Sequence, residues 1–254
     1  MELDELKIIA GREKFNIEIT EKDYLVTYLL YLLKDVKGIH FKGGTAINKI
    51  LLGHQRLSED LDFTVAGNLE DIEKEIKTKL KATIFNKVTH DKRVEGFTRL
   101  IVHYRLFHED GTIFIDLNKR AKLLLKPELR KIPNFYKGQI PDFQVSCLST
   151  KELIAEKIMA VCGRYRPRDY FDLYYIVKRK LPVDISLIKR KFKSVGLVFA
   201  VPLMFKNANK IFNQWKDDMF MLTKTRPDYK EVMKTLADYF KLKEEKEKLK
   251  SSIK

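Results

Sequence analysis

Apolar residues recur at two different spacings along the chain, and this difference separates predicted helices from predicted strands. A spacing of three and four residues predicts helices over residues 3–10 and 21–34. Thr20, followed three positions later by Asp23, is expected to cap the second of these helices. The apolar residues of the second helix form one broad stripe, which is expected to pack in the core.

Alternation with a period of two predicts the strands of a single small sheet. The predicted strands cover residues 36–42, 58–63, 84–88, 98–107, 112–117 and 143–148, and a helix opened by Asn68 or Asp71 follows the second strand and ends at Leu80. The turn Glu109-Asp110-Gly111 is expected to join two strands as a hairpin. The predicted fold class is α/β (α+β), with a small mixed sheet flanked by helices.

After residue 149 the pattern is helical almost throughout. Prolines at positions 127, 133 and 141 interrupt the basic stretch 119–141, which is therefore interpreted as a connector. A capping box at Ser149 and a stop at Gly163 bound the next predicted helix. Further helices are predicted from Asp169 to about residue 177 and over residues 184–194, 196–222 and 228–250. The predicted domains are residues 1–145 and 146–254.

One short stretch combines two glycines with a start of helical spacing. Gly43 and Gly44 let the backbone turn tightly and approach a ligand closely. Thr45 and the apolar run behind it open a helix, whose first amides are able to bind a phosphate. We expect the Thr45 hydroxyl and these amides to donate to a triphosphate.

Acidic residues follow this stretch at the spacing of a strand. Asp60 and Asp62 share one strand face, and Asp116 is a third acid in phase with the open side of its own strand. Carboxylate oxygens are the ligands that Mg²⁺ prefers. An Asp-x-Asp pair alone also fits an ordinary surface strand, but the glycine pair upstream favours a metal site. Ser58 is expected to hydrogen-bond within this loop, or to serve only as a turn residue.

These motifs resemble those of the nucleotidyltransferase superfamily related to DNA polymerase β. Within it, the chain resembles AbiEii-type toxins of toxin–antitoxin and phage-defence systems over about residues 38–178. The resemblance rests on Gly-Gly-Thr-Ala at 43–46, Ser-Glu-Asp-Leu-Asp-Phe at 58–63, Glu-Lys at 156–157 and Arg-Asp-Tyr-Phe-Asp-Leu-Tyr at 168–174.

The resemblance implies a polymerase β-like nucleotidyltransferase domain followed by a helical domain. The implied reaction transfers a nucleoside monophosphate from an NTP to an acceptor hydroxyl and releases pyrophosphate, with Mg²⁺ or Mn²⁺ as cofactor. Asp60 and Asp62 are expected to bind both ions, and Asp116 the catalytic one. A type IV toxin would be restrained by a separately encoded antitoxin, and some relatives modify the 3′ end of tRNA.

Four downstream residues, Lys157, Arg168, Asp169 and Asp172, extend the predicted site. Lys157 lies close to an apolar stripe, where an unpaired charge is costly, and a triphosphate would be a partner for it. The alternative is a lysine that snorkels from the helix edge. Asp169 or Asp172 is expected to support the site by holding Lys157, Arg168 or the nucleobase, although helix capping explains Asp169 equally well.

The net charge of the chain indicates which class of partner it binds. The net charge is +15 at pH 7, and a field of that sign attracts polyanions, so RNA such as tRNA is the expected acceptor. A lysine-rich composition that serves solubility is the alternative. Cys147 and Cys162 show neither a disulfide framework nor zinc spacing. Without a membrane-spanning run or a signal sequence, a cytoplasmic protein is expected.

Other function classes stay open at this point. A transferase acting on a protein or on a small hydroxyl acceptor would need the same three acids, but it would not need the large positive charge. A non-catalytic GTP-binding or nucleic-acid-binding module would not need all three acids.

Overall fold

The structure is a computed structural model that describes residues 1–107, 109–220 and 222–251. The chain divides into two compact units, Met1–Ser149 (unit 1) and Thr150–Lys254 (unit 2). The division falls after Ser149 rather than after residue 145, because the last strand of the sheet still belongs to unit 1.

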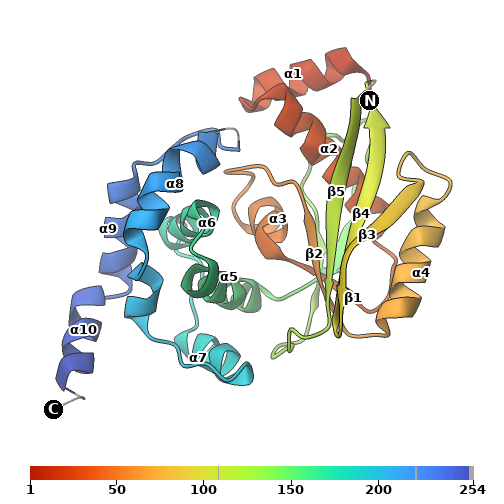
Figure 1. The fold of residues 1–254 in the computed structure, drawn as a ribbon. Coiled ribbons are helices and arrows are strands. Elements are labelled where there is room, and N and C mark those ends of the chain that lie inside the picture. Colours follow the sequence, from red (N-terminus) through yellow and green to blue (C-terminus); the bar gives the residue numbers. More distant parts are fainter. Residues whose placement is uncertain (108, 221, 252–254) are drawn as a thin grey trace. The chain divides into compact units, whose positions relative to one another are not determined.

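Unit 1 is built on a seven-stranded mixed sheet with the order β3-β4-β5-β2-β1-β7-β6 (Figure 1). The β2–β5 and β1–β7 pairs are parallel, and the other pairs are antiparallel. This confirms the predicted fold class of a mixed sheet flanked by helices. The strands are β1 (Ile39–Lys42), β2 (Leu61–Val65), β3 (Lys87–Val94), β4 (Phe97–Leu106), β5 (Glu109–Asn118), β6 (Glu128–Lys131) and β7 (Gln144–Cys147).

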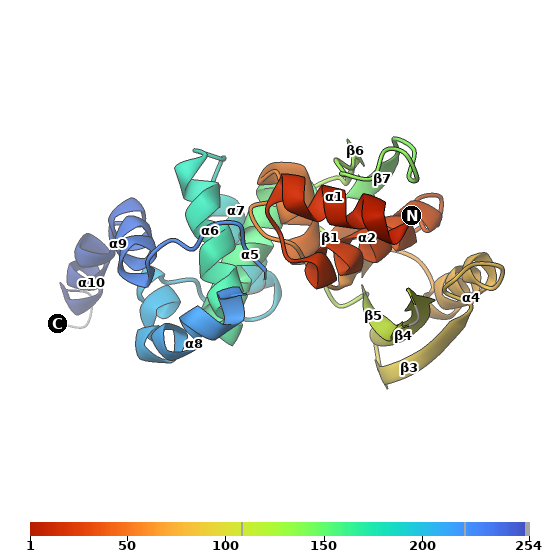
Figure 2. The same ribbon diagram turned by 90° about the horizontal axis from the view of Figure 1, so that it is seen from above.

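The two faces of the central strands differ in burial. Side chains alternate between faces along a strand. On one face, Leu100, Val102, Ile113 and Ile115 are completely buried in the core. Their sequence neighbours, among them Asp116, are only half-buried and form the opposite face. The helices of unit 1 are α1 (Leu3–Glu13), α2 (Ile17–Leu32), α3 (Gly43–Ala46) and α4 (Leu69–Leu80), and α4 lies beside β3 and β4 in both Figure 1 and Figure 2.

The start of α2 corrects the predicted cap. Asn16, not Thr20, is the N-cap, and its side chain accepts a hydrogen bond from the Glu18 amide. Thr20 lies inside the helix, and its hydroxyl donates to the Asn16 carbonyl. Asp23 is therefore not part of a capping box, and it is buried. Of the two residues predicted to open α4, Asn68 is confirmed as the N-cap, and Asp71 lies in the first turn.

Three strand predictions need correction. The strand predicted over residues 84–88 is instead β3, which begins at Lys87. Pairing of Leu106 with Glu109 extends the hairpin, so Glu109-Asp110-Gly111 lies within β5 instead of forming the turn. The predicted connector contains β6, an edge strand whose one apolar side chain, Leu129, is 68% exposed. An edge strand without a buried face has no period-two signal.

Unit 2 is helical, as predicted. Its elements are α5 (Thr150–Arg164), α6 (Pro167–Lys178), α7 (Ile185–Ser194), the 3₁₀ segment η2 (Val201–Phe205), α8 (Ala208–Phe220), α9 (Tyr229–Tyr239) and α10 (Leu242–Ser251). No helix among the described residues is long and apolar enough to cross a membrane.

The last two helix predictions merged separate elements. Residues 196–222 are not one helix, because Gly196 adopts a left-handed φ of 75° and Pro202 opens the 3₁₀ segment. Residue 221, in the same prediction, lies outside the described residues. Residues 228–250 form two helices, since Lys241 between them adopts a left-handed φ of 52°.

Candidate active site

Strand pairing brings two of the predicted acids together. Asp62 in β2 lies in register with Asp116 in the neighbouring parallel strand β5. Paired residues on adjacent strands, which lie about 4.8 Å apart, point to the same face. Asp60 precedes the first residue of β2 and lies two positions before Asp62. Asp62 and Asp116 thus lie side by side on one sheet face, whereas Asp60, which the strand predicted over residues 58–63 included, lies just before β2.

The first glycine packs against the second acid. Gly43 follows β1 with a φ of 78°, a conformation that favours glycine. A Cβ atom built on Gly43 would lie 2.1 Å from Oδ2 of Asp62. Glycine is therefore required at position 43 because the backbone lies against the carboxylate of Asp62. The predicted reason was the close approach of a ligand. The carbonyl of Gly44 accepts a hydrogen bond from Nδ2 of Asn48 at 3.1 Å.

Thr45 connects the glycine turn to the acidic loop. Its hydroxyl oxygen lies 2.6 Å from the Asp60 carbonyl oxygen and 2.7 Å from the Ser58 hydroxyl oxygen. The residue is 1% exposed. One hydroxyl proton cannot serve both oxygens, so Ser58 donates in one of these bonds. Thr45 and Ser58 thus fix the entry of the acid strand, and the hydroxyl expected to donate to a triphosphate is already engaged.

The helix predicted after the glycines is present as α3, and it continues into a π-helical segment, Ile47–Leu51. Lys49 in this segment is 2% exposed, and its Nζ lies 2.7 Å from Asp23 Oδ1 and 2.8 Å from the Thr27 hydroxyl, both on α2. The Tyr136 hydroxyl donates to the other Asp23 oxygen at 3.1 Å. This buried pair anchors the segment behind the glycine turn.

Arg99 is a functional-site residue that sequence reasoning missed. Its Nε and Nη2 donate to the two carboxylate oxygens of Asp116 at 2.7 and 2.8 Å. This bidentate bond to Asp116 raises the pKa of Arg99 above its ordinary value, with burial opposing the shift. No local sequence pattern predicts this contact, because it depends on the register of β4 against β5.

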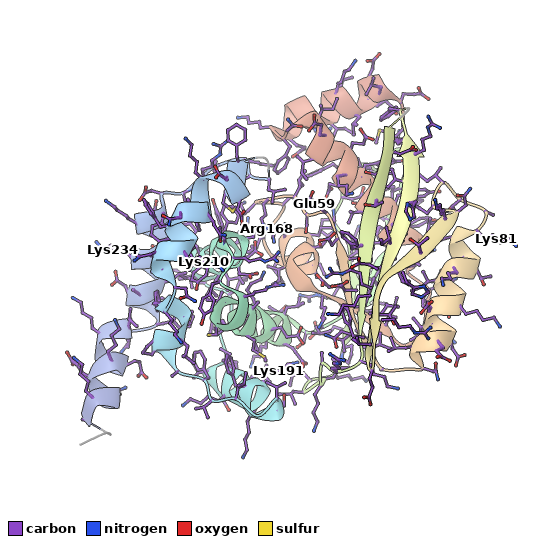
Figure 3. The ribbon with its side chains drawn as sticks, viewed as in Figure 1. Glu59, Lys81, Arg168, Lys191, Lys210 and Lys234 are labelled. Atoms are coloured by element: carbon purple, nitrogen blue, oxygen red, sulfur yellow. The ribbon has the colours of Figure 1, made fainter. Side chains whose placement is uncertain are left out.

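A second missed cation is Lys22 on α2. Burial lowers the pKa of Lys22, while the charges of Glu59 and Asp60 oppose that shift, so the ammonium lies near the acidic loop. Glu59 of that loop is labelled in Figure 3. Lys22 Nζ donates to the Thr112 carbonyl and lies 5.2 Å from the centre of the Tyr104 ring.

The donor atoms suit a hard divalent cation. Mg²⁺ usually takes one or two carboxylates from a protein and fills its octahedral shell with water and phosphate oxygens. Asp62 and Asp116 supply such a pair. As placed, no three acidic, histidine or cysteine side chains among the described residues surround a single metal position. Arg99 occupies both oxygens of Asp116, as described above.

In unit 2, Lys157 is held by both predicted acids. Its Nζ lies 2.8 Å from Asp169 Oδ1 and 2.8 Å from Asp172 Oδ2, and the three side chains are almost completely buried. The partner of this buried charge is thus a pair of carboxylates, and Lys157 does not snorkel to solvent. Asp169 is not the cap of α6, which begins at Pro167 after Arg166.

Arg164 completes this cluster. Its guanidinium donates to both Asp169 oxygens, at 2.9 and 3.2 Å. Burial alone would raise the pKa of Asp169, but Lys157 and Arg164 together lower it below its ordinary value. Arg168 is half-buried in the first turn of α6 and is labelled in Figure 3.

Solved structures with a similar fold include two that are described as nucleotidyltransferases. MenT4, a nucleotidyltransferase toxin from Mycobacterium tuberculosis, aligns with a TM-score of 0.61 and 19% identity over 89% of this chain and 75% of its own. JHP933 from Helicobacter pylori aligns with a TM-score of 0.59 and 19% identity over 94% and 97%. A putative nucleotidyltransferase from H. pylori gives 0.58 and 18% over 93% and 98%. The fold is that of the nucleotidyltransferase class.

The family follows from the sequence. The profile of the AbiEii nucleotidyl transferase toxins of type IV toxin–antitoxin systems matches residues 30–245. The chain belongs to this family and is a nucleotidyltransferase, as the motifs predicted. Membership implies an NTP substrate and an antitoxin partner. No curated protein matches the chain.

Proposed function

We propose that this nucleotidyltransferase transfers a nucleoside monophosphate from an NTP to the 3′-terminal hydroxyl of an RNA, most directly a tRNA, in the cytoplasm. The toxin activity would be restrained by its antitoxin and would serve phage defence. The observation that carries the transfer chemistry is the in-register pair Asp62 and Asp116 beside the close approach of Gly43.

The residues of unit 1 have separate roles in this proposal. Asp60, Asp62 and Asp116 hold Mg²⁺ or Mn²⁺, which neutralises phosphate charge and activates the attacking hydroxyl when bound. The backbone of Gly43 and Gly44 admits the triphosphate, and a side chain at Gly43 would displace Asp62. Thr45 and Ser58 keep Asp60 in place through the contacts described above.

The residues of unit 2 form a buried cluster of paired charges in the same proposal. Asp169 and Asp172 hold the buried Lys157 beside the first turn of α6, and Arg168 of that turn contacts phosphate oxygens of a substrate. A lysine held by two carboxylates keeps its orientation, so these acids act through Lys157.

The distribution of charge supports a polyanionic acceptor. Lys and Arg outnumber Asp and Glu by 25 to 13 in unit 2, but only by 25 to 22 in unit 1. Most of the net positive charge is therefore concentrated in the helical unit. A charge that served solubility alone would not need this uneven distribution.

The test measures which molecule receives a labelled nucleotide. Each NTP, labelled on the α-phosphate, is incubated with the protein, Mg²⁺ and total tRNA. We expect label in RNA. Loss of this label when the 3′ ends of the tRNA are first oxidised with periodate would locate the acceptor hydroxyl. Label on protein or on a small acceptor, or nucleotide binding without any turnover, would reject RNA transfer and support one of the other classes.

A further inference from the structure

Four charged residues form a row across four neighbouring strands. Arg99 in β4 is in register with Asp116 in β5, which is in register with Asp62 in β2, which is in register with Lys42 in β1. Residues paired in this way point to one face of the sheet. The two carboxylates are therefore adjacent like charges, with a cation on the outer side of each.

Arg99 satisfies Asp116 as a divalent ion would. Both oxygens of the carboxylate accept from the guanidinium, and such bidentate pairs are among the stronger hydrogen-bonded contacts in proteins. The Asp116 side chain is 19% exposed and that of Arg99 is 39% exposed. A cation bound between Asp62 and Asp116 would meet the positive charge of Arg99 a few ångströms away.

The strand β3 provides a second position for the guanidinium. The pairing of β3 with β4 shifts register between His90 and Lys92, so Asp91 lies in a bulge. Bulges redirect side chains, often beside active sites. Asp91 Oδ2 lies 3.8 Å from Arg99 Nη1, and the Asp91 side chain is 44% exposed. Arg99 thus forms a bidentate hydrogen bond with Asp116 and a longer ion pair with Asp91.

We propose that Arg99 and the divalent cation compete for Asp116, and that Asp91 receives the guanidinium when the cation binds. This inference rests on the proposed metal dependence. Arg99 is then a positioning residue that keeps the acid pair neutralised in the empty enzyme and sets the metal concentration at which the site fills. Asp91 acts through Arg99 and does not contact the metal.

The test measures Mn²⁺ binding without NTP, by the electron paramagnetic resonance signal of free Mn²⁺. Arg99→Gln should bind Mn²⁺ about tenfold more tightly than the wild type, since a nearby like charge is removed. Arg99→Lys, with a single-point charge, should fall between them. Asp91→Asn should bind more weakly by about threefold, because the displaced guanidinium loses its second partner.

The double variant separates the two roles. Asp91→Asn in the Arg99→Gln background should add nothing, because coupled residues are not additive. Arg93→Gln, which removes an exposed arginine that pairs with Glu70, is the matched control and should bind like the wild type. Far-UV circular dichroism checks that each variant is folded.

Unchanged or weaker Mn²⁺ binding by a folded Arg99→Gln protein would overturn the inference. So would an Asp91→Asn effect that persists without Arg99, since Asp91 would then act on the ion directly. Pyrophosphate release by the wild type is measured separately. Release together with the wrong order of Mn²⁺ affinities rejects the competition alone, whereas lack of release with every NTP and total tRNA rejects the proposed function.

Discussion

Single atoms decide whether the acid pair is correctly placed. Gly43 has room for no side chain, since a Cβ would lie 2.1 Å from Asp62 Oδ2 and the backbone is left-handed. Because Asp62 is the acid that pairs with Asp116, a displacement of Asp62 also changes the geometry of the proposed pair of metal ligands.

Gly43→Ala should lower pyrophosphate release by about 100-fold or more, because misplacement of a reacting group by about 1 Å costs that much. Gly138→Ala is the matched control, since a Cβ there meets nothing within 4 Å. Both variants are compared at equal folded fraction by circular dichroism. Full activity of Gly43→Ala would show that Asp62 tolerates displacement and is not a ligand.

The buried cluster in unit 2 predicts a pH dependence. The folded pKa of Asp169 is below its ordinary value, so its charge stabilises unit 2 above the unfolded pKa, near pH 4. This contribution is lost as the pH falls through the lower, folded pKa. Asp169→Asn should thus cost about 3–5 kcal/mol of unfolding free energy at pH 7, and less below pH 4.

Trp215 in α8 is the only tryptophan of the chain, so its fluorescence during urea unfolding reports on unit 2. Asp238→Asn, on the exposed side of α9, is the control and should change stability little. A cost for Asp169→Asn that is equally large at pH 3 and pH 7 would contradict the ionised, paired state of Asp169.

At the level of elements, buried ion pairs join helices whose contact the sequence does not predict. Lys49 and Asp23 fix the π-helical segment to α2. In unit 2, Lys191, labelled in Figure 3, joins α7 to α5 through Glu152 at 2.7 Å and Glu156 at 2.9 Å. Such pairs cost much when one partner is removed and little when both are replaced by apolar residues.

Lys49→Met should therefore lower the unfolding free energy by about 3–5 kcal/mol, and adding Asp23→Leu should restore most of it. Urea unfolding followed by far-UV circular dichroism measures both. Equal stability of Lys49→Met and the wild type would mean that the buried pair does not anchor the segment.

The elements also show what the sequence could predict. The glycine turn, the helix behind it and the Asp60–Asp62 spacing depend on neighbouring residues, and local patterns predict them. Arg99 depends on a register between distant strands, which no local spacing encodes. Lys49 did carry a signal, since it is a lysine inside an apolar run, as Lys157 is. β6 carried none, because its single apolar residue faces solvent.

For the whole molecule, the uneven charge predicts where RNA binds. On α7, Lys189, Arg190 and Lys193 are exposed, while Lys191 between them is buried. We expect these three exposed cations to contact RNA phosphates, and each such contact adds about 0.7–0.9 to the magnitude of the slope of log K against log salt concentration.

Replacing Lys189, Arg190 and Lys193 by Gln should reduce the magnitude of that slope by about 2–3 for tRNA. The control replaces three exposed lysines of unit 1, Lys74, Lys81 and Lys92, and should change the slope by less than one. Fluorescence anisotropy of labelled tRNA over a range of salt concentrations measures both. An equal change in the two triple variants would mean that RNA binding does not favour unit 2.

The acid pair of β2 and β5, Asp62 and Asp116, carries the proposed transfer chemistry. The most direct test compares pyrophosphate release, with all four NTPs and total tRNA, between the wild type, Asp62→Asn and Asp116→Asn at equal folded fraction. We expect release by the wild type and a loss of at least about 1,000-fold in each variant, since each removes an ionised ligand without a change in size. Near-normal release by either folded variant would contradict the central claim.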